Sequence, residues 1–274
     1  MTKSKTEIFI KRLIILTVIA ILLTGCASIE YNRALRKQEF ILMSSNREVK
    51  MGRSLSKKIK EKIKVVNDDL LRQRVKAIGQ KVADACERKD IIYHFEVLDC
   101  KDVNAFALPG GYIYVFKGLT DELDEEYFDD ELAYILGHEI GHVVAKHSVK
   151  RIQSALGYQL VKILIISNPN SREIAQGADL AFNQIMLGYS KQDEFTADAL
   201  GIAYMQKAGY NPQAAIKFLE KLKKINQESP AKPLYYVSTH PTIPSRIATV
   251  RMAISGRISF EDYIERIGEP CYRP

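Results

Sequence analysis

Cysteine is scarce in this sequence, and no two cysteines form a C-x-x-C pair. The 274 residues include four, at Cys26, Cys86, Cys100 and Cys271. Without closely spaced thiols, a zinc site built from thiolates is not expected. In an oxidising compartment, one disulfide can form among Cys86, Cys100 and Cys271, which leaves one free thiol. The sequence does not decide which pair forms.

Long apolar runs are also missing. The uncharged run from Leu13 to Leu23 is shorter than the ~20 residues that a membrane-spanning helix needs. A second apolar stretch, Leu160 to Ile166, is shorter still and indicates a core helix or a helix beside a cleft. The sequence therefore predicts no transmembrane helix.

The N-terminal segment instead has the features of a targeting signal. Basic residues up to Arg12 precede the apolar run, which ends at Leu23-Thr24-Gly25-Cys26. This ending resembles the lipobox of bacterial lipoproteins, which implies that residues 1–25 are a signal peptide removed before Cys26 and that Cys26 carries lipid. Since Ala27 and Ser28 follow, rather than aspartate, we expect the periplasmic face of the outer membrane. The alternative is an uncleaved N-terminal anchor.

Aromatic residues are absent from the most basic segment, residues 47–64. Base stacking is therefore not expected there, and the net charge of +7 does not by itself predict nucleic-acid binding. A solvated helix face accounts for the basic character of this segment. A weak attraction to anionic headgroups near the lipid anchor is the alternative.

Hydrophobic periodicity predicts an α+β chain that is mostly α. Residues 91–98 read as a strand, and residues 104–116 read as a hairpin that turns at Pro109-Gly110-Gly111. Helical patterns cover residues 45–88 with a break near 66–68, then 172–188, 191–208, 212–226 and 244–255. No internal repeat is found. We expect a tether over residues 26–44 and one domain over residues 45–274.

The stretch E-L-A-Y-I-L-G-H-E-I-G-H-V-V-A-K-H, residues 131–147, predicts a buried helix that carries charged and imidazole side chains at its centre. Buried imidazoles and carboxylates are costly unless something satisfies them. His138 and His142 are four apart and share a helix face, so both can bind one metal ion. Glu139 lies beside them, where it can accept a proton from the water that attacks a peptide. Satisfied core histidines are the alternative.

A catalytic zinc needs a third protein ligand and an open position. On a continuous helix His147 would lie opposite His138, so it is expected to be a surface or packing residue rather than a ligand. Glu194 and Asp198 are four apart on a second, largely apolar helix. Glu194 can ligate the metal, and Asp198 can accept the second N–H of a ligand histidine. A solvated charged pair is the alternative.

Four motifs in order resemble the zinc metallopeptidase family of HtpX and the CAAX prenyl proteases, most of all its exported bacterial lipoprotein members. They are N-A-F-A-L-P-G-G-Y-I-Y-V-F-K-G-L (104–119), H-E-I-G-H (138–142), E-F-T-A-D (194–198) and S-T-H-P-T-I-P-S-R-I (238–247). The resemblance covers roughly residues 45–255 and implies a zincin-like domain with a small antiparallel sheet packed beside the active-site helix. The tandem helical repeats that follow this domain in some members are not found, so recruitment of partners through such repeats is not implied.

The resemblance also assigns roles residue by residue. It implies one zinc ion per chain on His138, His142 and Glu194, with Glu139 as the base. Asp198 matches a carboxylate that orients a ligand, and Arg246 follows His240 at the matching place. His240 itself matches a histidine placed over the metal. It either stabilises the tetrahedral oxyanion or closes the resting site as a reversible extra ligand.

The hairpin suggests how substrate is held. Gly111, Tyr112, Ile113, Tyr114 and Val115 read as the start of a strand that borders the cleft in the family. If this strand is an edge strand, it can pair with an extended peptide through main-chain hydrogen bonds. The alternative is that Tyr112, Tyr114 and Phe116 pack a core face.

These observations predict a zinc metalloendopeptidase of the bacterial envelope that degrades misfolded or misassembled membrane and periplasmic proteins. A chaperone-like lipoprotein that contains zinc but rarely cleaves is a second interpretation, although a binding protein does not need Glu139. A structural zinc site is a third, with His240 as its fourth ligand. The expected partners are unfolded proteins and, through Cys26, the membrane; no nucleic acid is expected, and the oligomeric state is not predicted.

Overall fold

A computed structural model of the chain describes residues 28–32, 34–41, 43–155, 188–228 and 235–256. The expected signal peptide with Cys26, the apolar stretch 160–166, nearly all of the helical pattern 172–188, and Cys271 lie outside these residues. Within them, none of the helices has both the length and the apolar character needed to cross a membrane. Cys86 and Cys100 are both free thiols, and Cys86 is buried.

Two helices begin the main domain, as predicted. α2 spans Ser45–Lys62 and α3 spans Asp69–Ala83. The break between them is stabilised at the start of α3, where Asp68 accepts a hydrogen bond from the Leu71 N–H at 2.9 Å. Such a side-chain cap satisfies one of the backbone donors that a helix start leaves unpaired.

A three-stranded mixed sheet follows, in the order β3-β5-β4. β3 (His94–Leu98) pairs parallel with β5 (Tyr112–Phe116), and β4 (Ala105–Leu108) pairs antiparallel with β5. The short 3₁₀ turn η1 (Pro109–Gly111) joins β4 to β5, and Gly110 and Gly111 adopt φ of 75° and 88°, which suit glycine.

The order of the strands contradicts the prediction that β5 is an edge strand. Both edges of β5 are already paired, so the backbone of Tyr112, Ile113, Tyr114 and Val115 is not free to bind a peptide, and Gly111 only leads into the strand. All five residues of β5 are buried, which fits the alternative that they pack the core. Among the described strands of this sheet, β3 and β4 form the edges.

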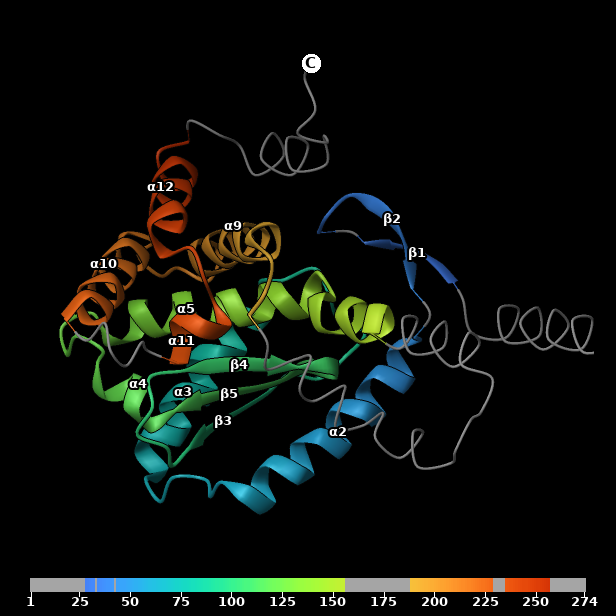
Figure 1. Cartoon of the computed structure of the whole chain (residues 1–274), viewed down its shortest axis with the longest axis horizontal. Coiled ribbons are helices and arrows are strands. Elements are labelled where there is room, and N and C mark those ends of the chain that lie inside the picture. The colour runs from blue at the N-terminus through green and yellow to red at the C-terminus, as the bar shows by residue number, and fades with distance from the viewer. Residues whose placement is uncertain (1–27, 33, 42, 156–187, 229–234, 257–274) are drawn as a thin grey trace, which may run out of the picture.

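The histidine-containing helix lies across the sheet. After the short helix α4 (Lys117–Asp121), α5 spans Phe128–Val144, and its first turn carries Asp129, Asp130 and Glu131, where negative charge suits the helix dipole. Figure 1 shows α5 between the sheet and a layer of later helices. These are α9 (Lys191–Lys207), α10 (Gln213–Glu228) and α12 (Ile243–Ile254). The short helix α11 (Tyr235–Thr239) lies instead on the sheet side of α5, next to β4, where the Tyr236 N–H donates to the Val103 carbonyl at 3.0 Å. The α+β, mostly α, fold class is confirmed.

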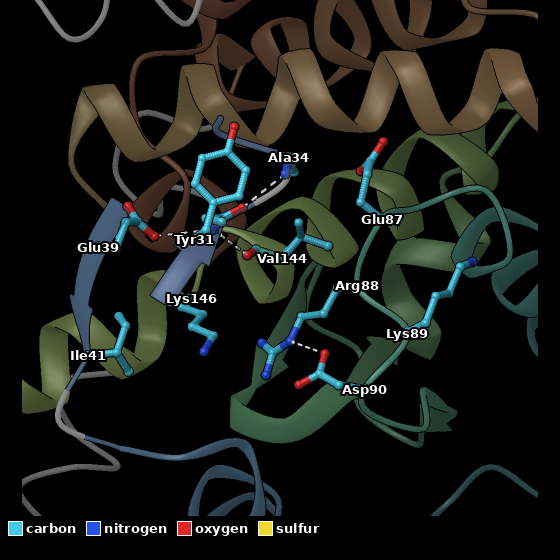
Figure 2. A pocket seen from close by; sticks show the side chains of 11 residues that line it. Tyr31, Ala34, Glu39, Ile41, Glu87, Arg88, Lys89, Asp90, Val144 and Lys146 are labelled. Carbon is cyan, nitrogen blue, oxygen red and sulfur yellow. Dashed lines mark hydrogen bonds and ion pairs between the residues drawn. The ribbon is translucent and has the colours of Figure 1, made fainter. Parts of the chain in front are cut away.

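The expected tether contains structure. β1 (Ser28–Asn32) and β2 (Lys37–Ile41) form an antiparallel hairpin. It contacts the end of α5, because the Asn32 side chain donates to the Val144 carbonyl at 3.0 Å. A cavity of about 490 Å³ lies between this hairpin and the domain. Figure 2 shows it, with Glu39 on one side and the ion-paired Arg88 and Asp90 on the other.

Candidate metal centre

Glycines allow α9 to approach α5 closely enough to share a site. A Cβ atom on Gly137 would lie 2.9 Å from the Gly201 carbonyl oxygen, and one on Gly141 would lie 2.8 Å from that of Ala197. Neither position therefore tolerates a larger side chain without moving the two helices apart. This contact explains why two helices distant in sequence present their polar side chains to the same point.

Four metal-capable side chains meet there. They are His138 and His142 from α5, Glu194 from α9 and His240 from the residue after α11, and their ligand atoms all lie within 4.8 Å of one another. The Nε2 atoms of the two α5 histidines are 3.0 Å apart. The Glu194 carboxylate is 3.4 Å from His142 Nε2 and 3.6 Å from His138 Nε2. All four are fully or almost fully buried.

Glu139 lies beside this cluster and is also fully buried. Within the described part of the chain, neither of its carboxylate oxygens has a hydrogen-bond partner. The imidazole of His240 lies close to it, with Nε2 3.4 Å from Glu139 Oε1. Burial raises the pKa of Glu139, and the nearby histidines partly offset this rise. A buried base without a partner is suited to accept a proton from a reacting group.

Asp198 and Arg246 surround the first ligand. His138 Nδ1 is 2.8 Å from Asp198 Oδ1, so an Nδ1–H of His138 points at a carboxylate and Nε2 is left for a metal. Arg246 contacts Asp198 through two nitrogens, both at 2.8 Å, and pairs with Glu194 at 2.9 Å. Burial alone would raise the pKa of Asp198, but Arg246 and His138 outweigh it and lower that pKa to about 2.

The charges and donor types of the site fit a divalent cation. Among the described residues the site holds three buried carboxylates, of Glu139, Glu194 and Asp198, and one guanidinium, of Arg246, which pairs with the last two. Burial lowers the pKa of His142 to about 3, which keeps its imidazole neutral as ligation requires. A set of imidazole nitrogens and one carboxylate is a donor set that zinc accepts.

The sequence analysis missed three neighbours of the ligands. Tyr134, one turn before His138, donates its hydroxyl to Asp198 Oδ1 at 2.7 Å. The ring of Tyr189 stacks on His142 with centroids 3.8 Å apart. His147 is buried and not at the surface, and its Nδ1 lies 2.8 Å from His142 Nδ1. The i, i+4 spacing could have revealed Tyr134, whereas nothing in the local sequence marks Tyr189.

The site combines two histidines four apart on one helix, a glutamate from a second helix, and a buried glutamate without a partner among the described residues. This combination defines the site of a metal-dependent peptidase. The comparisons with known proteins agree. The chain is 29% identical over 221 residues to the Beta-barrel assembly-enhancing protease of Escherichia coli, which covers 76% of this chain and 44% of that protein. It is 26% identical over 265 residues to Metalloprotease LoiP of Escherichia coli, which covers 90% of this chain and 97% of that protein.

A third relative is the Mitochondrial metalloendopeptidase OMA1 of Arabidopsis thaliana, 30% identical over 178 residues, or 65% of this chain and 35% of that protein. The profile of peptidase family M48 matches residues 69–254. The chain belongs to this family and is a metallopeptidase, which confirms the resemblance found in the sequence. It spans less than half the length of the beta-barrel assembly-enhancing protease, so the activities of that whole protein are not transferred here as findings.

Proposed function

We propose that this protein is a zinc-dependent endopeptidase of the bacterial cell envelope, acting on misfolded or misassembled membrane and periplasmic proteins. The observation that carries the proposal is the unpartnered Glu139 carboxylate beside the buried cluster of His138, His142 and Glu194. Zinc in such a site supplies Lewis acidity, both toward a carbonyl oxygen and toward water. The alternative of a chaperone-like lipoprotein leaves Glu139 without a role.

Different residues of the chain transfer the proton and hold the ligands in place. Glu139 is placed to take a proton from the attacking water and to return it to the leaving amide nitrogen. Asp198 holds the proton on His138 Nδ1, and Arg246 holds Asp198 and Glu194 in place. Both glycine contacts keep the helices fixed while this happens.

His240 has two proposed roles that the geometry lets us compare. Its Nδ1 is 3.1 Å from Glu194 Oε1 and 3.2 Å from His138 Nε2, so this nitrogen faces the ligand atoms. Its Nε2 faces the Ala105 carbonyl at 3.2 Å. This arrangement supports a reversible extra ligand that closes the resting site. Movement away from the ligands would then free the imidazole to stabilise the oxyanion.

The edge strand β4, not β5, is the strand that we propose to pair with substrate. The Ala105 and Ala107 carbonyls contact His240 and Ser148, so these two residues turn their backbone away from β5. Because N–H and C=O of one residue share a side in antiparallel strands, the Ala107 N–H also points away from β5. A peptide added here would lie next to the metal ligands.

We expect Ala107→Pro to retain the fold and the bound metal and to lose most of its activity on casein, because one outward donor is removed. The matched control is Phe106→Pro, which removes a donor on the side paired with β5 and should destabilise the sheet. Circular dichroism, metal content and casein hydrolysis are measured on both. A folded Ala107→Pro variant with parental activity would show that the substrate does not bind by pairing with β4.

Location rests on Cys26, and here the envelope assignment is a proposal supported by the lipobox-like sequence. Cys26→Ser is expected to block lipid attachment and to leave an unprocessed or mislocalised precursor. The control is Cys86→Ser, which alters a buried thiol of the domain and should not change fractionation. Immunoblots of membrane fractions and metabolic labelling with a palmitate analogue measure both. Normal processing and outer-membrane fractionation of the Cys26 variant would contradict the lipobox.

Product analysis separates the proposed peptidase from the chaperone-like alternative. Purified protein is incubated with unfolded casein, and the mixture is examined by mass spectrometry. New internal termini support endopeptidase activity. Casein that is bound and kept soluble but remains intact supports the alternative.

A further inference from the structure

The end of α5 is built so that His147 turns back toward the metal ligands. α5 ends at Val144, and Lys146 adopts φ of 55°, a left-handed conformation that is uncommon outside glycine. A further helical segment begins at His147 itself. This break moves His147 off the position that a continuous helix would give it, opposite His138, and places it beside His142.

Side chains from elsewhere in the fold hold this break. Arg88 donates to the Val143 carbonyl at 2.8 Å, and Asn32 of the N-terminal hairpin donates to the Val144 carbonyl at 3.0 Å. Both carbonyls belong to the last turn of α5, where a helix leaves acceptors without an intrahelical partner, and that of Val143 also accepts from the Lys146 N–H at 3.1 Å. A strained residue persists only when its surroundings fix it, and such residues concentrate at functional sites.

His147 and His142 form a direct imidazole–imidazole contact. Their Nδ1 atoms are 2.8 Å apart, and their ring planes are inclined by 71°. One of the two nitrogens must therefore carry the proton. When His142 ligates a metal through Nε2, its proton is on Nδ1, so His142 donates and His147 Nδ1 accepts.

The second nitrogen of His147 continues the chain of contacts. With Nδ1 as acceptor, the proton of His147 is on Nε2, which lies 3.3 Å from Asp193 Oδ1. Asp193 is itself fixed in the capping box at the start of α9, where its other oxygen accepts from the Ser190 hydroxyl at 2.7 Å. Glu194, the proposed third ligand, is the next residue along.

We propose that His147 is a positioning residue that fixes the tautomer and ring orientation of His142 through the chain His142–His147–Asp193. The inference rests on the proposed function, since it assumes that His142 binds the metal. The two ligand histidines are then oriented differently: His138 by a carboxylate directly, and His142 by a second imidazole that passes its contact to a carboxylate. This chain of contacts also connects the ligand His142 to the start of α9, the helix that carries the proposed ligand Glu194.

The test compares zinc affinity between two substitutions of the same residue. His147→Asn places a side-chain oxygen near the position of Nδ1 and keeps an acceptor, whereas His147→Leu has none. Removal of an outer hydrogen-bond partner typically weakens metal binding by 10–100-fold, so we expect about that loss for leucine and a much smaller one for asparagine. The matched control is His94→Leu, which removes a histidine that stacks on Tyr112 in another part of the domain and should leave affinity unchanged.

Zinc affinity of the full chain is measured by competition with a chromophoric chelator, with circular dichroism as a check on folding. The inference would be overturned if His147→Leu bound zinc with the parental affinity, or if the leucine and asparagine variants lost equal affinity. In either case, zinc binding by the parent protein would leave the proposed function standing. A parent that binds no zinc contradicts the proposed function itself.

If His147→Leu does not fold, the tautomers of the parent decide the question. The chain has five histidines, so ¹⁵N-histidine spectra of the zinc-loaded protein can be assigned by substitution. We expect the proton of His142 on Nδ1 and that of His147 on Nε2. A proton on Nδ1 of His147 would overturn the inference.

Discussion

Replacement of Glu139 by glutamine is expected to reduce casein hydrolysis by about 10²–10⁴-fold, the usual contribution of a positioned base. Glutamine has nearly the same shape, so the buried position is filled and zinc should remain bound. The lost group is the carboxylate whose two oxygens have no hydrogen-bond partner among the described residues. Initial rates and zinc content are measured on the same preparation.

Glu131→Gln is the matched control for this variant. Glu131 lies on the same helix and is equally buried, but its carboxylate accepts from the Asp124 N–H and pairs with Lys221. We expect near-parental hydrolysis from it. A Glu139→Gln protein that digests casein at the parental rate would contradict the assignment of the base.

Glu194→Ala is expected to lose most of its bound zinc along with its activity. The substitution removes the carboxylate that lies 3.4 Å and 3.6 Å from the two helix histidines, and two imidazoles alone make a weak site. Among the described residues, it also leaves Arg246 with Asp198 as its one remaining buried ion-pair partner, so a loss of stability is expected. Elemental analysis after dialysis measures the metal, and thermal unfolding measures stability.

The control for the third ligand is Glu220→Ala. Glu220 lies on α10 and forms an exposed ion pair with Arg251 of α12. This variant should retain a full complement of zinc. Undiminished zinc in the dialysed Glu194→Ala protein would mean that another side chain is the third ligand.

The sequence predicted the centre of the site because that part depends on local geometry. His138, Glu139 and His142 lie on one helix, and the spacing of a helix is known in advance. Glu194 and Asp198 also share a helix face by spacing, and the apolar character of their helix favoured Glu194 as the third ligand before the resemblance strengthened that assignment. The close approach at Gly137 and Gly141 is what brings the two faces together.

The parts that could not be predicted depend on contacts between distant segments. The alternation of Tyr112 to Phe116 indicated a strand, yet only its pairing with β3 on one side and β4 on the other makes it central. The left-handed Lys146 carries no glycine or proline signal, so a continuous helix was assumed and His147 was placed on the wrong side. The hairpin within residues 26–44 was likewise missed.

The most direct test of the account is the metal dependence of casein cleavage by the purified protein. The protein is treated with a chelator, dialysed, and then assayed before and after one equivalent of zinc is added back, with the Glu139→Gln protein in parallel. The account predicts that cleavage stops on chelation and returns with zinc in the parent, but not in the Glu139→Gln protein. Cleavage that persists after complete removal of metal would contradict it.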